Sequence, residues 1–483
     1  MIGKLFRASL VALVVLIGVI AFNTWRYAPS DQPILDAALP SVDADALAQS
    51  LSQAVTFETI SYLPPRPSPA FGAFLTWLEA EFPVAHAAMT QERINTLTPL
   101  YRWAGADPSL RPVLLAAHYD VVPIAPGSDD KWDHPPFSGT IADGFIYGRG
   151  TLDDKGAIVA MLGAVEALLA DGFTPPRDIY FSFGHDEEIG GVKGAYGVVK
   201  HLREKGIRME WSLDEGSMVL RDIISGLDKD VASINVSEKG YATLDITARA
   251  EGGHSSLPPA QTAVGALAKA VANVQDTPMP GGLTDASKDF FDRLGPHFAL
   301  TERILFANQW LFRPVLEYVL SGSAATNAML RTTTAPTMLT GSNKENVLPQ
   351  EATATVNFRL HPRDTIQDVV DHVTQAVNNP EIDITVRPGA GEASPVSRAD
   401  NTAFALLDKT FRQVFGELIV VPGLTVAGTD SKHYSLIADD AYRINPFIFT
   451  AQDLPRFHGN NERVSVEAMG QAAQFYMMLL RNL

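Results

Sequence analysis

Residues 113–120 read VLLAAHYD, a short apolar run that ends in a histidine, a tyrosine and an aspartate. A continuous apolar run of this length is typical of a strand that is buried on both faces. Similar runs lie at 179–183 and 209–213, and the segments 155–169 and 195–202 repeat apolar residues at helical spacing. Strands that alternate with helices predict an α/β domain with a mostly parallel sheet.

The pattern changes near residue 236. Segments 242–248 and 353–359 alternate apolar and polar residues with period two, and 263–274 and 365–377 have helical spacing. Such strands and helices predict a smaller α+β unit inserted into the α/β domain. The predicted organisation is an N-terminal segment at 1–27, a tether at 28–42, the first part of the α/β domain at 43–235, the smaller unit at 236–390 and the second part at 391–483.

The stretch 298–322 is rich in aromatic and aliphatic residues, among them Trp310 and Phe312. We interpret it as a pair of core helices of the smaller unit. The alternative is a surface that contacts an acyl chain or a membrane.

The N-terminus has the composition of a membrane-directed segment. Lys4 and Arg7 precede an apolar run at 8–22. Fifteen residues fit the core of a cleaved signal peptide, whereas the 21 residues 5–25 are enough to span a bilayer as an anchor. In both cases we expect the rest of the chain to be exported, either tethered in the periplasm or outside the cell, or secreted after cleavage.

Composition limits the chemistry that the chain can perform. Its 483 residues include no cysteine, which excludes thiolate metal sites, iron–sulfur clusters and cysteine nucleophiles. Lys and Arg total 38 against 55 Asp and Glu, so the net charge is −17 and nucleic acid is not an expected partner. Any metal ion must therefore be held by His, Asp and Glu.

Acidic and histidine side chains follow the predicted strands, precede a helix or lie in a loop near the carboxyl end. In chain order they are His118, Asp120, Asp153, Glu187, Glu188, Asp214 and His458. Because the carboxyl ends of parallel strands share one edge of a sheet, we expect these groups to converge. Singly, each has a plainer explanation, such as a helix N-cap for Asp153. Together, two histidines with several carboxylates and no thiolate suit Zn²⁺, either alone or as a carboxylate-bridged pair.

Six motifs carry a resemblance to a known family. They are HYDVVP at 118–123, GRGTLDDKG at 148–156, GHDEE at 184–188, LDEG at 213–216, GGHSSLP at 252–258 and HGNNER at 458–463. In this order and spacing they resemble the di-zinc aminoacylase and carboxypeptidase S family, in particular its N-fatty-acyl-amino-acid synthase/hydrolase branch. The resemblance covers roughly residues 45–480 and implies an α/β zinc domain that is interrupted by a ferredoxin-like lid.

The resemblance implies a role for each side chain of this group. Asp153 would bridge two zinc ions, and Glu187 would be the general base. The other ligands would be His118 and Asp214 at one ion and Glu188 and His458 at the other, with Asp120 orienting His118.

The resemblance also implies a substrate-binding set. His254 would stabilise an oxyanion, Asn346 and Arg359 would grip the substrate carboxylate, and Gly428 and Thr429 would lie in a substrate-facing loop. The plainer interpretations are hydrogen bonding within the smaller unit for His254 and Asn346 and a surface ion pair for Arg359. In some relatives the histidine acts across a dimer, whereas others are monomers with an enlarged lid, so monomer and homodimer both remain open.

These features predict a zinc-dependent hydrolase that cleaves the amide bond next to an amino acid with a free α-carboxylate. The substrate is a short peptide, as for a carboxypeptidase, or an N-acyl amino acid, for which the reaction can also run in reverse. The stretch 298–322 and the membrane-directed segment favour a lipophilic acyl group. The alternative is a non-catalytic metal- or ligand-binding module on the same scaffold, which the presence of Glu187 and all five ligand positions opposes.

Overall fold

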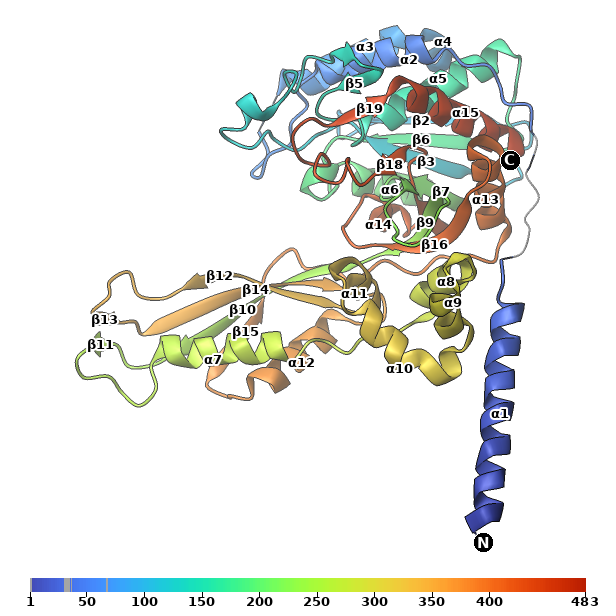
Figure 1. Cartoon of the computed structure of the whole chain (residues 1–483). Coiled ribbons are helices and arrows are strands. Elements are labelled where there is room, and N and C mark those ends of the chain that lie inside the picture. The colour runs from blue at the N-terminus through green and yellow to red at the C-terminus, as the bar shows by residue number, and fades with distance from the viewer. Residues whose placement is uncertain (1, 30–34, 36, 67) are drawn as a thin grey trace.

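The computed structural model describes residues 2–29, 35, 37–66 and 68–483. Figure 1 shows a large body that contains both the first and the last part of the chain, a smaller sheet beside it, and a single long helix that projects away from both. The smaller sheet is formed by the middle of the chain, in agreement with the change of pattern in the sequence.

The body is built on a ten-stranded mixed sheet. Its centre runs in the order β6 (Ile179–Gly184), β3 (Val113–His118), β7 (Met209–Asp214) and β17 (Ala438–Arg443), and each of these neighbours is parallel to the next. The predicted α/β class is confirmed, although the sheet as a whole is mixed because antiparallel pairs lie on both sides of this centre. The flanking strands are β1 (Thr90–Ile94), β2 (Thr98–Trp103), β8 (Val219–Arg221), β9 (Val231–Glu238), β16 (Ile419–Thr425) and β18 (Ile448–Thr450).

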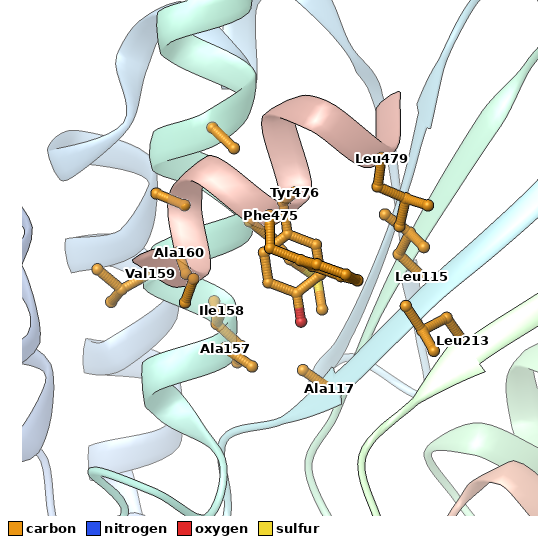
Figure 2. Close-up of a cluster of buried hydrophobic side chains, with 14 of the residues drawn as sticks. Leu115, Ala117, Ala157, Ile158, Val159, Ala160, Leu213, Phe475, Tyr476 and Leu479 are labelled. Atoms are coloured by element: carbon orange, nitrogen blue, oxygen red, sulfur yellow. The ribbon is translucent and has the colours of Figure 1, made fainter. Parts of the chain in front are cut away.

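Successive residues of β3 feed two separate cores. Leu115 and Ala117 belong to the main cluster, which includes residues of helices α5 (Lys155–Ala170) and α15 (Val466–Asn482), as Figure 2 shows. Leu114 and Ala116 belong to the cluster on the other face, together with residues of α6. An apolar run with no alternation is therefore required, since both faces of the strand are covered. The other helices of the body are α2 (Ala44–Val55), α3 (Pro69–Glu81), α4 (Pro83–Ala88), α6 (Ala195–Glu204), α13 (Thr402–Phe415) and α14 (Ser431–Tyr434), and a small sheet joins β4 (Ile141–Ala142), β5 (Phe145–Tyr147) and β19 (Arg463–Ser465).

The smaller sheet has four antiparallel strands in the order β12, β14, β10, β15. Its elements follow one another as β10 (Gly240–Arg249), α7 (Ala263–Asp276), β12 (Thr333–Thr340), β14 (Glu351–Leu360), α12 (Ile366–Val377) and β15 (Ile382–Val386). This βαββαβ sequence is the ferredoxin-like arrangement. The sheet packs against α7 and α12 with a hydrophobic core of its own, and β11 (Gly253–His254) pairs with β13 (Val347–Leu348) beyond it.

Two adjacent segments lead directly from the body to the smaller sheet and back, and residues 285–330, between α7 and β12, form a further connection because they pack on the large sheet. β9 remains paired with β16 as far as Glu238, and β10 begins at Gly240. The returning chain runs beside this crossing, since Tyr241 and Gly391 exchange backbone hydrogen bonds of 2.9 and 2.8 Å and the Ser394 N–H donates to the Glu238 carbonyl at 3.1 Å. Glycine is required at 240, because a Cβ there would lie 2.5 Å from the backbone nitrogen of Ala393.

The aromatic stretch 298–322 lies in a group of helices formed by α8 (Asp285–Leu294), α9 (Leu300–Ala307), α10 (Gln309–Leu320) and α11 (Ala324–Leu330). Their buried residues share one cluster with Val231 of β9 and Val421 of β16. The stretch is therefore helical, as predicted, but its core partner is the large sheet rather than the smaller one. One face of α10 remains exposed.

The N-terminal helix α1 (Ile2–Arg26) is long and apolar enough to cross a membrane, and most of its side chains are exposed. Its C-terminal end is attached to the α8–α10 helices. Asn308 contacts both Asn23, at 3.0 Å, and Thr24, at 3.2 Å, and the Tyr27 hydroxyl donates to the carbonyl of Asp292 at 3.0 Å.

The packing of α15 on the sheet predicts a large loss of stability from Phe475→Ala. Phe475 is fully buried, with its ring 4.4 Å from that of Phe411 between centroids. We expect the free energy of unfolding to fall by about 3–5 kcal/mol in urea titrations of the detergent-solubilised chain. The exposed Val84→Ala should change it by no more than about 0.5 kcal/mol. Equal losses in the two variants would contradict the assignment of Phe475 to the core.

Candidate active site

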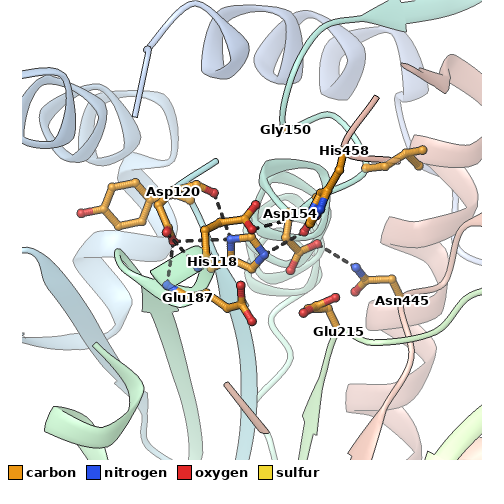
Figure 3. A network of polar contacts seen from close by, with 12 residues as sticks. His118, Asp120, Gly150, Asp154, Glu187, Glu215, Asn445 and His458 are labelled. Atoms are coloured by element: carbon orange, nitrogen blue, oxygen red, sulfur yellow. Dashed lines mark hydrogen bonds and ion pairs between the residues drawn. The ribbon is translucent and has the colours of Figure 1, made fainter. Parts of the chain in front are cut away.

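The candidate site lies at the edge of the large sheet where β3, β6 and β7 end side by side. His118 is the last residue of β3, and Glu187 and Glu188 begin a 3-10 turn (Glu187–Ile189) just after β6. Asp214 is the last residue of β7. The predicted convergence at one sheet edge is therefore present in the structure (Figure 3).

Asp153 lies between the two histidines. Its Oδ1 is 2.9 Å from Nε2 of His118, and its Oδ2 is 2.8 Å from Nε2 of His458. Oε2 of Glu188 is 3.5 Å from the same nitrogen of His458. One carboxylate thus presents a separate oxygen to each histidine, which is the arrangement required of a ligand that bridges two cations.

Asp120 fixes the orientation of its neighbours. Its backbone carbonyl accepts the Nδ1–H of His118 at 3.0 Å, and one oxygen of its carboxylate is 3.5 Å from the same nitrogen, opposite the side of the ring that faces Asp153. The same carboxylate accepts a 2.7 Å hydrogen bond from the Ser61 hydroxyl and 3.1 Å bonds from the backbone N–H groups of Glu187 and Glu188. It therefore holds both the imidazole and the turn that carries the two glutamates.

Ligand atoms are close enough to hold a metal ion in two places among the described residues. His118, Asp153 and Glu188 offer atoms within 4.8 Å of one another, and so do His118, Glu187 and Glu215. Oε1 of Glu188 and Oδ2 of Asp214 are also buried without a hydrogen-bond partner in the described chain. Imidazole and carboxylate donors with unpartnered buried oxygens fit a divalent cation such as Zn²⁺.

Two adjacent carboxylates compete for one position in this group. Glu215, which the sequence analysis did not select, lies within reach of His118, whereas Asp214 does not belong to either group of three. Asp214 is the more deeply buried of the two, and burial raises its pKa to about 6. Its Oδ1 accepts the N–H of Glu215 at 3.0 Å, which leaves Oδ2 free.

The protonation preferences of the site differ sharply between neighbours. Burial raises the pKa of the Glu187 carboxyl well above its usual range, with His118 opposing the shift and Glu215 adding to it. Burial acts in the same direction on Asp153, but hydrogen bonds with His118 and His458 hold the pKa of Asp153 below its ordinary value. Hydrogen bonding therefore favours the charged form of Asp153, whereas burial favours the protonated form of Glu187.

Glu462, which lies within the motif HGNNER but was not among the predicted site residues, connects two loops of the site. Its fully buried carboxylate accepts hydrogen bonds from the N–H groups of Gly150 at 3.0 Å and Leu152 at 2.9 Å. It also pairs with Arg149 at 2.6 Å. Because Glu462 follows His458 by four residues, these bonds fix the loop of Asp153 relative to the loop of His458.

The loop that begins at Gly428 contacts the site through the buried side chains of Thr429 and Asp430. Gly428 is exposed, but Thr429 is buried and its hydroxyl donates to Glu238 at 2.6 Å, so this side chain positions the loop. Asp430 follows, buried and with neither oxygen bonded within the described chain. A Cβ at Gly184 would lie 2.6 Å from this carboxylate, which explains the glycine that precedes the histidine of GHDEE.

Of the three remaining predicted substrate residues, Arg359 lies in β14 of the smaller sheet, whereas His254 and Asn346 lie at the β11–β13 pair beyond it. His254 pairs with Val347 through β11 and β13, at the end of this sheet that is far from the body in Figure 1. The backbone carbonyl of Asn346 accepts the N–H of Ser255 beside this pair of strands. The guanidinium of Arg359 lies 5.0 Å from the centre of the Tyr241 ring. The structure does not bring His254 or Asn346 to the histidines and carboxylates of the body.

Comparison with known proteins identifies the family. The model of peptidase family M20/M25/M40 matches residues 114–482, which include every residue of the body site described above except Ser61. The chain belongs to this family. The resemblance stated from the motifs, and with it the prediction of a metal-dependent hydrolase, is confirmed.

Relatives with similar sequences extend over almost the whole chain. A probable carboxypeptidase S-like 2 of Dictyostelium discoideum is 39% identical over 99% of this chain and 95% of its own length. The N-fatty-acyl-amino acid synthase/hydrolase PM20D1 of Xenopus tropicalis is 38% identical over the same shares. Among solved structures, the M20 family metallo-carboxypeptidase Sso-CP2 from Sulfolobus solfataricus has the same fold, with a TM-score of 0.63 at 19% identity over 90% of this chain and 98% of that one.

The free oxygen of Asp214 leads to a prediction about metal content. We expect Asp214→Asn to lose one equivalent of zinc relative to the parent chain, and Glu215→Gln to retain it, because only Asp214 has a buried oxygen without a partner. Metal analysis of the purified variants after dialysis measures this. The opposite result would assign the position to Glu215, which the distances to His118 also allow.

Proposed function

We propose that this chain is an exported zinc hydrolase that cleaves the amide bond between an acyl group and an amino acid with a free α-carboxylate, and that the acyl group is lipophilic. The observation that carries the proposal is the carboxylate of Asp153, held between His118 and His458 beside Glu187. The names of the two similar relatives support both the amide chemistry and an N-acyl amino acid as substrate.

Five side chains of the body would hold two zinc ions. Asp153 would contribute one oxygen to each ion, with His118 and Asp214 on one side and Glu188 and His458 on the other. When bound, zinc acts as a Lewis acid that polarises the amide carbonyl and lowers the pKa of water.

Glu187 would transfer the proton. It takes a proton from the attacking water and gives it to the nitrogen of the leaving amino acid, so the carboxylate is restored at the end of the reaction. Its raised pKa suits both steps, because a carboxylate of ordinary acidity would hold the proton too weakly. Asp120 supports this role indirectly, since it accepts the backbone N–H of Glu187 and fixes the turn.

We assign the smaller sheet the role of a lid. His254, Asn346 and Arg359 would bind the oxyanion and the carboxylate of the substrate, either after the sheet moves toward the body or from a second copy of the chain. The hydrophobic core that this sheet shares with α7 and α12 supports movement as one body.

A groove beside the site supports a lipophilic acyl group. It has a volume of about 880 Å³ and is lined mainly by apolar side chains, including Ile60, Ile124 and Phe137. Its lining comes from the chain segments on both sides of the site residues Ser61 and Asp120, namely Ile60 and Tyr62 in one and Pro123 and Ile124 in the other. By contrast, the aromatic stretch 298–322 packs on β9 and β16, so the groove rather than this stretch is the proposed binding site of the acyl group.

The helix α1 supports export. Its length and composition suit a membrane anchor with Lys4 and Arg7 on the inner side, and a cleaved signal is the alternative. An anchor would hold the enzyme at the outer surface of the membrane, where amphiphilic N-acyl amino acids accumulate.

The substrate class is tested by comparing two compounds with the same leaving amino acid. We expect the zinc-loaded chain to release phenylalanine faster from N-oleoyl-phenylalanine than from an N-blocked Gly-Phe dipeptide, as measured by kcat/KM. Faster release from the dipeptide would make the enzyme a carboxypeptidase and leave the groove without an acyl-binding role.

Glu187→Gln is the matching test of mechanism. We expect kcat to fall roughly 10²–10⁴-fold on both compounds while zinc content stays at the parent level, because the amide cannot accept the proton. Full activity of this variant would show that another group is the base. Loss of zinc would instead show that Glu187 is a ligand.

A further inference from the structure

The exposed face of α10 is apolar along its whole length. Trp310, Leu311, Val315, Tyr318 and Val319 are exposed, with 60% of Trp310 and 82% of Tyr318 accessible. At 100° per residue these positions fall within one half of the helix surface. The opposite side holds Leu316 and Leu320, which are buried in the cluster that packs on the large sheet. The helix thus has a core face and a second apolar face that residues 2–29, 35, 37–66 and 68–483 leave uncovered.

The charged residues of α10 are directed away from this second face. Arg313 and Glu317 pair with each other at 2.8 Å. Both also bind the backbone of Leu283, Arg313 through its carbonyl at 2.9 Å and Glu317 through its N–H at 3.0 Å. Within α10 itself, the exposed apolar half therefore contains no charged side chain, which is unusual for a surface in contact with water.

The position of α10 relative to α1 identifies what can cover this face. Asn308, the residue directly before α10, lies between the two helices. Its side chain bonds Thr24 at 3.2 Å and the carbonyl of Ile20 at 3.4 Å, and it accepts from Asn23 at 3.0 Å. Figure 1 shows α10 beside the C-terminal part of α1 and inclined to it. α10 therefore begins directly after a residue that is bound to the only helix in the described chain that is suited to a bilayer.

The position along α1 at which Asn308 is bound matches the boundary of a bilayer. Residues 5–25 of α1 extend over about 31 Å at 1.5 Å per residue. This is the thickness of the hydrocarbon layer, about 30 Å. If Lys4 marks one boundary, the other falls near Asn23 to Trp25, at the level where Asn308 is bound. Trp25 and Trp310 are both exposed there, and indole side chains favour the membrane interface.

We propose that α10 is an interfacial helix, whose face of Trp310, Leu311, Val315, Tyr318 and Val319 enters the outer leaflet of the membrane that α1 spans. The proposal rests on the anchoring role proposed for α1. It gives the body a second attachment point, so that the enzyme is held against the bilayer in one orientation rather than tethered at variable angles. A helix of this kind is buried about 5–10 Å below the headgroups.

The absence of cysteine from the sequence makes a direct test possible. Single cysteines are introduced into the full chain by Val315→Cys in α10, Val15→Cys in α1 and Val84→Cys in α4, and each is labelled with a nitroxide. The proteins are reconstituted in phosphatidylcholine vesicles, and power-saturation EPR compares the accessibility of each label to oxygen, which enters lipid, and to a water-soluble nickel complex. Zinc content and dipeptide cleavage confirm that each variant is folded.

The three positions form a matched set, since each replaces a valine that is exposed in the protein. We expect the ratio of oxygen to nickel accessibility at 315 to be several-fold higher than at 84 and to approach the ratio at 15. A ratio at 315 equal to that at 84, with 15 still in lipid, overturns the proposal for α10 and leaves the anchor intact. If 15 is also in water, both the anchor and the proposal fail, while the proposed hydrolysis is unaffected.

Two other occupants of the face give different signals. A second copy of the chain would produce spin–spin broadening at 315 that disappears on dilution with unlabelled protein. A substrate acyl chain would protect 315 only after N-oleoyl-phenylalanine is added. Either result overturns the proposal.

Discussion

Repulsion between buried carboxylates at one edge of the large sheet is the constraint on which the rest of the structure depends. Glu187, Glu188 and Asp214 are all largely removed from water, and burial raises the pKa of each. Like charges in such a place destabilise a fold unless donors or cations offset them. The chain satisfies Asp120 and Glu462 with backbone N–H groups and leaves unpartnered oxygens on Glu188 and Asp214, which is the pattern of a site built for a divalent cation.

The surrounding fold serves to keep these groups in register. They come from separate segments of the chain, with Glu187 and Glu188 on one turn and Asp214 at the end of β7, and the residues behind them connect those segments. Asp120 joins the end of β3 to the turn after β6, and Glu462 joins the loop of Asp153 to that of His458. Gly184 leaves the space that Asp430 occupies. Much of the precision of the site therefore resides in residues that touch neither metal nor substrate.

The sequence pattern was sufficient to predict the main helices and strands and the convergence of the site residues at one sheet edge. It was not sufficient to predict the direction of individual side chains. The run at 113–117 predicts a strand that is covered on both faces, because a strand with one face in water would alternate apolar and polar residues. Every residue of β3 is indeed buried. The adjacent Asp214 and Glu215 could not be ranked, since the direction of each depends on the turn after β7. Glu462 was missed because an acidic residue in a polar motif usually faces solvent. For 298–322, periodicity predicts an apolar helix face but does not say which sheet covers it, and α10 has two such faces.

The adjacent crossings between the two sheets restrict how the smaller sheet can move. The α8–α11 helices, which lie between α7 and β12 in the chain, pack on β9 and β16, so the smaller sheet is attached to the body through this group as well as beside the bonds between Tyr241 and Gly391. Glu238, at the first attachment, is buried with Arg443 at 2.8 Å and also holds Thr429. A displacement of the smaller sheet at this attachment would therefore reach the loop of Asp430 through the contact between Glu238 and Thr429.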